Sequence, residues 1–312
     1  MDIQSDSALE KVCQLIESCR LQEAAQFLDE TLPSDLDNDE LFFTANSCRY
    51  WHNALENLSA LDVFEQGETI INTWKGYTAF IERQKTVSEK AVYSFRKGFF
   101  SLALEKYSAA PDEQDPALIA EICRKKGLCY KKLGSYESAL KCLTEANAAL
   151  EGQASIIAEM ADCWALCGEE KNAKLLFKEA FYIDAQKIDF SFLDSKMINL
   201  LIKEVESKGY SGAALQEWVP VYAVIMGIFT YRRLLRSNEV LRLKQGIYAL
   251  ESELKNPTND AEVLTPKLLN RYFWLIDYYK SVKESAPKID EVLLHIRIHD
   301  TGIYNSYRKA YF

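Results

Sequence analysis

Residues that interrupt helices are scarce in this chain of 312 residues, which contains 7 prolines and 12 glycines. Runs of alternating apolar and β-branched residues, the usual signal of a strand, are nearly absent, and the best of them, residues 292–298, is short. Because helix breakers and strand signals are both rare, the sequence predicts a protein built of helices. The predicted fold class is all-α.

Signatures of common catalytic and cofactor sites are also missing. The chain has no glycine-rich phosphate loop, no nucleophile elbow and no HExxH motif. Active sites assemble from residues far apart in sequence, so an enzyme or regulator with a site after residue 237 stays an alternative. We expect a protein that is not an enzyme and that uses no cofactor and no metal.

Histidine is the rarest of the potential metal ligands, with three copies: His52, His295 and His299. His295 and His299 are four residues apart, so on a helix they share a face, as zinc ligands often do. Their neighbours match no metal-binding signature. A partly exposed helix end is therefore favoured over a metal site.

The charge balance and the apolar stretches limit the choice of partners and location. The net charge of −9 disfavours general attraction to nucleic acid or anionic lipid. The most apolar stretch, residues 213–235, contains Glu217 and Pro220 and is interrupted before the ~20 residues that a bilayer requires. No signal peptide and no membrane span are predicted. The eight cysteines lie mostly in helical patterns as small apolar residues, so we expect a cytoplasmic, reducing environment.

An internal repeat is visible when the chain is overlaid on itself with a shift of 34 residues. Residues 127–146 then align with residues 161–180 without a gap. The matching positions hold, in order, a small residue, an aromatic residue, a glycine, an alanine, a large apolar residue and an alanine. These pairs are Gly127/Ala161, Tyr130/Trp164, Gly134/Gly168, Ala139/Ala173, Leu143/Phe177 and Ala146/Ala180.

Each copy predicts two antiparallel helices joined by a tight turn. Gly134 and Gly168 are expected to end the first helix, because a positive φ costs little only for glycine. One pair cannot bury its apolar face alone, so the pairs are expected to stack. These residues resemble the tetratricopeptide repeat (TPR), although neither copy has the closing proline of the family. The resemblance implies a TPR-like α-α superhelix, a solenoid of antiparallel helix pairs.

Weaker copies flank these two. Gly98 is predicted as the turn of an upstream copy and Gly209 as the turn of a downstream copy, whose first helix is lengthened by seven residues around 190–196. Near the start, a second helix is expected after Leu21, closed by Pro33, and residues 39–85 predict two long helices. The expected second helices carry these residues: Leu21, Ala24, Leu28; Ala103, Tyr107, Ala110; and Ala214, Trp218, Val221.

The predicted organisation has three parts. Divergent N-terminal helical pairs occupy residues 1–83, TPR-like repeats occupy residues 84–237, and a C-terminal helical region occupies residues 238–312. The C-terminal region either continues the solenoid or forms a helical cap on its end. The repeats are expected at about 84–117, 120–153, 154–187 and, in degenerate form, 188–237. The C-terminal helices are expected at 239–254 (capped by Asn238), 268–285 (opened by Pro266) and 289–298 (opened by Pro287).

The TPR resemblance also implies a binding surface, since the first helix of each pair lines a concave groove in that family. Arginine and lysine on this face would hold carboxylates of a peptide. Leu128 and Asp162 stand where the best-known peptide-binding form has asparagine, so that specificity is not carried over. An ordinary solvated helix face is the alternative. The face comprises Phe95, Arg96, Arg124, Leu128, Lys131 and Lys132, followed by Glu159 and Asp162.

We therefore expect a scaffold or adaptor that binds a partner protein or peptide through the TPR groove. The alternative is a homo-oligomeric structural protein, for example a homodimer, that assembles through its aromatic C-terminal region. That region includes Tyr272, Phe273, Trp274, Tyr278 and Tyr279, whose helical spacing favours core packing.

Overall fold

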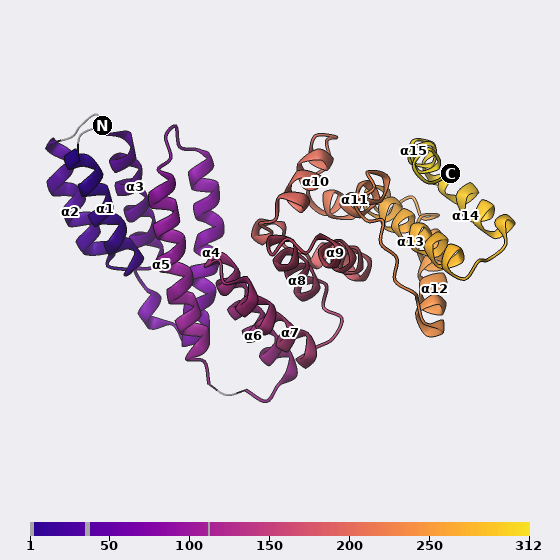
Figure 1. The fold of residues 1–312 in the computed structure, drawn as a ribbon, viewed down its shortest axis with the longest axis horizontal. Helices are drawn as coiled ribbons and strands as arrows, with labels where there is room; N and C mark the ends of the chain where they lie inside the picture. The colour runs from indigo at the N-terminus through magenta and orange to yellow at the C-terminus, as the bar shows by residue number, and fades with distance from the viewer. Residues whose placement is uncertain (1–2, 35–37, 112) are drawn as a thin grey trace. The chain divides into compact units, whose positions relative to one another are not determined.

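The computed structural model describes residues 3–34, 38–111 and 113–312, and every regular element in these ranges is helical. The described residues form fifteen α-helices and four short 3-10 helices. Most helices pack against their sequence neighbours, which is consistent with a helical repeat (Figure 1). The predicted all-α class is confirmed. Within the described ranges, no helix combines the length and apolarity needed to cross a bilayer.

The chain forms two compact units, residues 1–149 (unit 1) and residues 150–312 (unit 2), and each is described by itself. The expected boundaries at 83 and 237 lie inside these units. Helix α4 (Val63–Glu82) packs on α5 (Glu89–Ser108) across the first, and α11 (Gly212–Ile225) packs on α13 (Ala261–Ser281) across the second. The two clear copies of the repeat therefore belong to different units.

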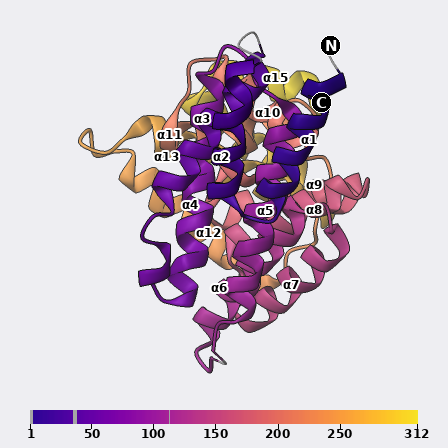
Figure 2. The same ribbon diagram turned by 90° about the vertical axis from the view of Figure 1, so that its left-hand side faces the viewer.

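Unit 1 begins with a ring of five helices (Figures 1 and 2). Consecutive helices are in contact from α1 to α5, and α5 also packs on α1, which closes the ring. Helix α6 packs on α5, and α7 packs on α6. The expected helix after Leu21 and the two long helices within residues 39–85 are confirmed. The remaining bounds are α1 (Ile3–Glu17), α2 (Leu21–Thr31), η1 (Leu32–Ser34), α3 (Asp39–Ala54), η2 (Leu58–Ala60), α6 (Pro116–Lys132) and α7 (Tyr136–Ala149).

Aromatic side chains fill the interior of this ring. Trp51 of α3 stacks on Phe99 of α5 with their ring centroids 3.7 Å apart. Tyr77 of α4 and Phe95 of α5 lie against the same indole, with centroids 5.5 Å and 6.4 Å from it. All four side chains are buried, so large apolar surfaces from three helices stabilise the ring.

The turn predicted at Gly98 is wrong, because α5 runs unbroken through this residue. A Cβ atom built at Gly98 would lie 2.5 Å from the carbonyl oxygen of Ile16 in α1. Glycine is needed here for the close approach of two helices and not for a turn. The expected pair at 84–117 is therefore a single helix followed by a connection, and the true partners of α5 are α4, α1 and α6.

The turns predicted at Gly134 and Gly168 are confirmed, and their geometry is the same. Gly134 has φ +81° and Gly168 has φ +83°. The amide of Gly134 donates to the carbonyl of Lys131, and the amide of Ser135 donates to that of Tyr130, 2.9 Å away. The turn at Gly168 repeats both hydrogen bonds. These are the two bonds of a Schellman motif, which ends a helix at a left-handed residue.

Cys19 forms a third turn of this kind between α1 and α2. Its φ is +55°, its amide donates to the carbonyl of Ile16, and the amide of Arg20 donates to that of Leu15. The spacing that marks the second helix of the repeat is also present, because Ala24 and Leu28 follow Cys19 as Ala139 and Leu143 follow Gly134. Cys19 stands where the two clear copies of the repeat have glycine. Because glycine was the residue that marked the turn in those copies, the turn at Cys19 could not be recognised from the repeat pattern.

Unit 2 has one continuous apolar core that includes residues of every α-helix from α8 to α15. The hairpin of α8 and α9 contributes Ala161, Phe177 and Ala180, which the repeat predicts as core positions. Helix α13 lies against α11, α12 and α14, and α15 packs on α14 and α11. The remaining bounds are α8 (Ala154–Leu166), α9 (Glu170–Asp184), η3 (Ala185–Lys187), η4 (Phe190–Phe192), α10 (Lys196–Glu206), α12 (Ser237–Glu253), α14 (Ala286–His299) and α15 (Thr301–Tyr311).

The prediction of a lengthened helix around residues 190–196 is wrong. Residues 185–192 form the two 3-10 turns η3 and η4, and α10 begins only at Lys196. The side chains of Asp184 and Asp189 accept hydrogen bonds from the backbone amides of Gln186 and Ser191. Such local bonds give the backbone an alternative to a continuous helix. The turn at Gly209 does have a positive φ of +92°, and α11 follows it.

Helix boundaries in the C-terminal region also differ from the prediction. Helix α13 begins at Ala261, where the side chain of Asp260 caps it, so Pro266 lies inside the helix and does not open it. Helix α12 begins at Ser237, and the Glu239 carboxylate accepts from the amide of Arg236 in place of a cap by Asn238. Pro287 does lie in the first turn of α14. The last helix, α15, was not predicted; it begins after Asp300, whose side chain accepts from the amide of Ile303.

We expect glycine to be more stabilising than alanine at these turns. At residue 134 the wild type is compared with Gly134→Ala. At residue 19, Cys19→Gly is compared with Cys19→Ala, because neither variant has the thiol. Each alanine variant should unfold about 1 kcal/mol more readily, because a Cβ disfavours the left-handed backbone. Urea denaturation followed by circular dichroism measures this difference.

The exposed helical residue Ser138 is the control. At that position alanine should be more stable than glycine by about 1 kcal/mol, so the order of the two residues reverses. Equal stability of alanine and glycine at residues 134 and 19 would contradict the role given to the turns.

Candidate functional site

The structure divides the predicted peptide-binding residues into buried and partly exposed ones. Phe95 belongs to the aromatic core of the ring, and Leu128 is 1% exposed in α6. Lys131 is only 2% exposed, so its ammonium group is not displayed on an open face. Arg96, Arg124 and Lys132 are partly exposed. The neighbouring helices α5 and α6 carry all six residues, but only these three reach the surface.

Two basic residues of α6, Arg124 and Lys125, are paired with carboxylates. The guanidinium of Arg124 donates through Nε and Nη2 to both oxygens of Glu121, at 2.8 Å and 2.6 Å. Lys125, which is 7% exposed, lies 2.7 Å from Glu68 Oε1 in α4 and 3.7 Å from Glu121. The Tyr107 hydroxyl donates to Glu68 at 2.5 Å. Lys125 and Tyr107 join α4, α5 and α6 through Glu68, and Arg124, the member of this network predicted to hold a ligand, is bonded to Glu121 of its own helix.

Burial alone would raise the pKa of Glu121, but Arg124 and Lys125 lower the pKa of this carboxyl below its usual range. Burial and the bond to Glu68 raise the pKa of Tyr107, so its hydroxyl stays protonated and acts as a donor. At neutral pH the Glu121 carboxyl is therefore charged and the Tyr107 phenol is neutral.

The acidic residues predicted to follow the basic ones are also internal. Asp162 of α8 is fully buried, and its two carboxylate oxygens accept the backbone amides of Asp194 and Ser195, each at 2.8 Å. Glu159 is 5% exposed. Asp162 thus fixes the start of α10 against α8, which is a structural role.

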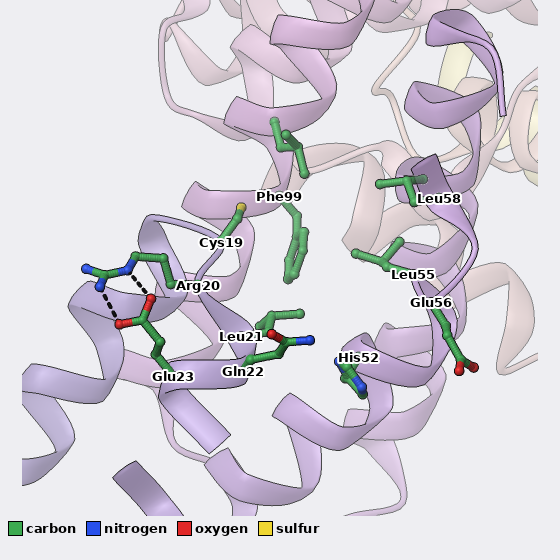
Figure 3. A pocket seen from close by; sticks show the side chains of 11 residues that line it. Cys19, Arg20, Leu21, Gln22, Glu23, His52, Leu55, Glu56, Leu58 and Phe99 are labelled. Atoms are coloured by element: carbon green, nitrogen blue, oxygen red, sulfur yellow. Dashed lines mark hydrogen bonds and ion pairs between the residues drawn. The ribbon is translucent and has the colours of Figure 1, made fainter. Parts of the chain in front are cut away.

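A cavity of about 560 Å³ lies in unit 1 (Figure 3). It is bounded by the turn between α1 and α2, the end of α3, η2 and the middle of α5. The apolar lining comes from leucines and one phenylalanine, and polar side chains from α2 and α3 complete the lining. The lining residues are Cys19, Arg20, Leu21, Gln22, Glu23, His52, Leu55, Glu56, Leu58, Phe99 and Leu102.

Two walls of this cavity are fixed by contacts already described. Phe99 is fixed by its stacking on Trp51, and the first turn of α2 is placed by the left-handed backbone of Cys19. Arg20 and Glu23 form an ion pair on the side away from Phe99 (Figure 3). Burial, with a smaller contribution from Glu105, raises the pKa of the Cys19 thiol to about 11. The thiol is therefore protonated at neutral pH and is a poor nucleophile.

Sequence reasoning missed this cavity because its lining comes from three separate segments, residues 19–23, 52–58 and 99–102. The one available signal was the repeat-like spacing after Cys19, which would have placed residues 20–23 at the start of a second helix. That Phe99 and Leu102 face this turn follows from the packing of α5 on α1, which no local pattern encodes.

A second cavity, of about 520 Å³, lies in unit 2 and is lined by residues 186–191, Gly212, Leu215 and Gln216. The Gln216 amide donates to the carbonyl of Ile188 at 3.0 Å. The adjacent Glu217 is 2% exposed, accepts from Gln186 at 3.2 Å and lies 3.7 Å from the Lys267 ammonium. Burial raises the pKa of Glu217, although Lys267 and Gln186 oppose the shift.

The histidine pair on α14 lies beside two groups from neighbouring helices. His295 Nδ1 is 3.6 Å from Glu251 of α12, and the Tyr272 hydroxyl of α13 donates to the same carboxylate at 2.5 Å. Burial lowers the pKa of His299, which favours its neutral form. Among the residues that the structure describes, no group of three or more His, Cys, Asp or Glu side chains is arranged to hold a metal ion.

The aromatic residues of the C-terminal region pack within the chain. Tyr272, Phe273, Trp274 and Tyr279 are buried, as their spacing predicts. Tyr307 of α15 stacks on Phe273 with centroids 4.5 Å apart, and the Tyr311 hydroxyl donates to the carbonyl of Val224. These side chains attach α15 to the core of unit 2.

No family model matches the chain, and no curated protein matches its sequence.

We expect the salt-bridge network of α6 to make stability depend on pH. The pKa of Glu121 is lowered in the folded state, so its ion pairs stabilise the protein above the ordinary carboxyl pKa of about 4.3, and this contribution is lost as the pH falls. Glu121→Gln should therefore lower the free energy of unfolding at pH 7, and the difference should vanish in acid.

Glu217→Gln should change the free energy of unfolding at pH 7 in the opposite direction to Glu121→Gln. The pKa of Glu217 is raised, so its charged form opposes folding at neutral pH, and the variant should be more stable at pH 7 with a gain that shrinks in acid. Urea titrations at several pH values measure both. The same sign for the two variants would contradict the assigned environments.

Proposed function

We propose that this chain is a non-enzymatic protein-interaction scaffold of the TPR type, which binds a segment of a partner protein. Three helix hairpins support the proposal: α1–α2, α6–α7 and α8–α9 share the same two turn hydrogen bonds and, in the second helix, a buried alanine and a large buried apolar residue at the same spacing. Repeated hairpins of this kind commonly present extended surfaces to other proteins.

The cavity of unit 1 is the observation that carries a binding role. Its volume of about 560 Å³ falls within the range of about 300–1,000 Å³ that ligand sites occupy. Leu21, Leu55, Leu58 and Leu102, which are partly exposed around the buried Phe99, offer an apolar surface to one or two side chains of a peptide. Polar groups beside them can pair with the peptide backbone, since Gln22 and His52 each carry hydrogen-bonding atoms.

The predicted TPR groove is the other candidate binding site in unit 1. It shares α5 with the cavity, but it retains only Arg96, Arg124 and Lys132 near the surface, and Arg124 is already bonded to Glu121. A partner carboxylate at this face would have to replace an existing ion pair, which reduces the net gain. The cavity has no such competition for its apolar surface, and we therefore place the partner there.

The alternatives draw less support from the geometry. Self-assembly through the aromatic C-terminal region would need aromatic side chains that already pack against the core of unit 2. An enzyme or regulator with its site after residue 237 would centre on Glu251, Tyr272 and His295, which are held by their own contacts.

The test of the cavity uses two tryptophan substitutions in α2. Affinity purification from native cells with mass spectrometry identifies the partner, and calorimetry with purified proteins measures its affinity. Gln22→Trp, which obstructs the cavity, should weaken binding at least tenfold. Gln26→Trp, one turn later on the same helix and outside the lining, should leave binding unchanged.

The outcomes separate the two sites. Loss of binding by Arg96→Glu with Lys132→Glu, while Gln22→Trp binds normally, would place the partner in the predicted groove and overturn the cavity. A protein that captures no partner under native conditions would count against the scaffold role itself.

A further inference from the structure

Helix α12 in unit 2 has one packed face and one face turned to solvent (Figure 1). Val240, Leu243, Ile247 and Leu250 are buried and carry the packing of α12 on α13. Their spacing of three and four residues uses one side of the helix. The opposite side is exposed at Leu241, Gln245 and Tyr248.

Two large apolar side chains lie on that exposed side. Leu241 is 59% exposed and Tyr248, seven residues later on the same side, is 75% exposed. Leu234, seven residues before Leu241, is 67% exposed in the segment that leads into the helix. Gln245 lies between them. We call Leu241, Gln245 and Tyr248 the outer face of α12.

Cations border the outer face. Arg242 flanks it on one side and Lys244 on the other, and both are exposed; Arg236 is exposed at the start of the helix. Of the three carboxylates on α12, Glu239 is bonded to Arg233 and Glu251 accepts the Tyr272 hydroxyl, and Glu253 lies five residues beyond Tyr248 at the end of the helix. A basic border is notable on a chain with a net charge of −9.

We propose that the outer face of α12 binds an acidic amphipathic helix of a partner protein. Leucine and tyrosine seven residues apart fit between the apolar side chains of a second helix, as in other helix pairs. Carboxylates beside the apolar stripe of the partner would pair with Arg242 and Lys244. Tyrosine supplies much of the energy at such contacts because it buries a large rigid surface.

The same charges argue against a second copy of this chain as the occupant. A symmetric pair of α12 helices would place Arg242 and Lys244 of each copy against those of the other, with no carboxylate on the face to compensate. Like charges across an interface disfavour association. This inference concerns unit 2 and does not depend on the cavity of unit 1.

The test uses two synthetic helical peptides on the full chain. Both carry leucines at positions a and d of three heptads; one has glutamate and its twin has lysine at the flanking positions. Fluorescence anisotropy at low salt should show the glutamate peptide binding at least tenfold more tightly. Leu241→Ala with Tyr248→Ala should weaken it at least tenfold, whereas Leu200→Ala, an equally exposed leucine in α10, should not.

Charge reversal checks the recognition by charge. Arg242→Glu with Lys244→Glu should weaken the glutamate peptide and strengthen its lysine twin. Equal binding of the two peptides, or binding unaffected by Leu241→Ala with Tyr248→Ala, would overturn the proposal. A dimer in light scattering that Tyr248→Glu dissociates would replace the partner with a second copy. Preferential binding to phosphatidylserine vesicles through the same residues would replace it with a membrane surface.

Discussion

Each of the three matching hairpins depends on one residue with a left-handed backbone. Gly134, Gly168 and Cys19 hold the chain where a helix must end and its antiparallel partner must begin. The helix that follows can then bury its alanine and its large apolar residue against the helix before it. At Cys19 the same turn also positions the first residues of α2 beside Phe99, and so helps to form the cavity of unit 1.

Features that depend on local chemistry were predictable from the sequence. The turns at Gly134 and Gly168 and the buried Ala139 and Phe177 follow from a repeated pattern whose physical reason is local. Gly98 misled the prediction because glycine serves equally in a turn and in a close contact between helices. Only the packing of α1 on α5 distinguishes the two uses, and that contact joins residues about eighty positions apart.

The candidate sites were less predictable because they depend on which side of each helix is covered. Lys131 looks like a surface charge in the sequence, yet neighbouring helices bury it. Tyr248 looks like a core residue, yet it is among the most exposed side chains of α12. In both cases the residue type disagrees with its environment, and such a disagreement is visible only once the packing is known.

The closed ring has a consequence for how this architecture can change in length. In an open array each hairpin touches only its neighbours, so terminal units can be gained or lost with roughly additive effects on stability. Here α1 and α5 share an interface, and deleting the first hairpin would uncover the backbone contact at Gly98 together with part of the aromatic interior. We therefore expect the first five helices to fold and unfold together, because α1 and α5 share this interface.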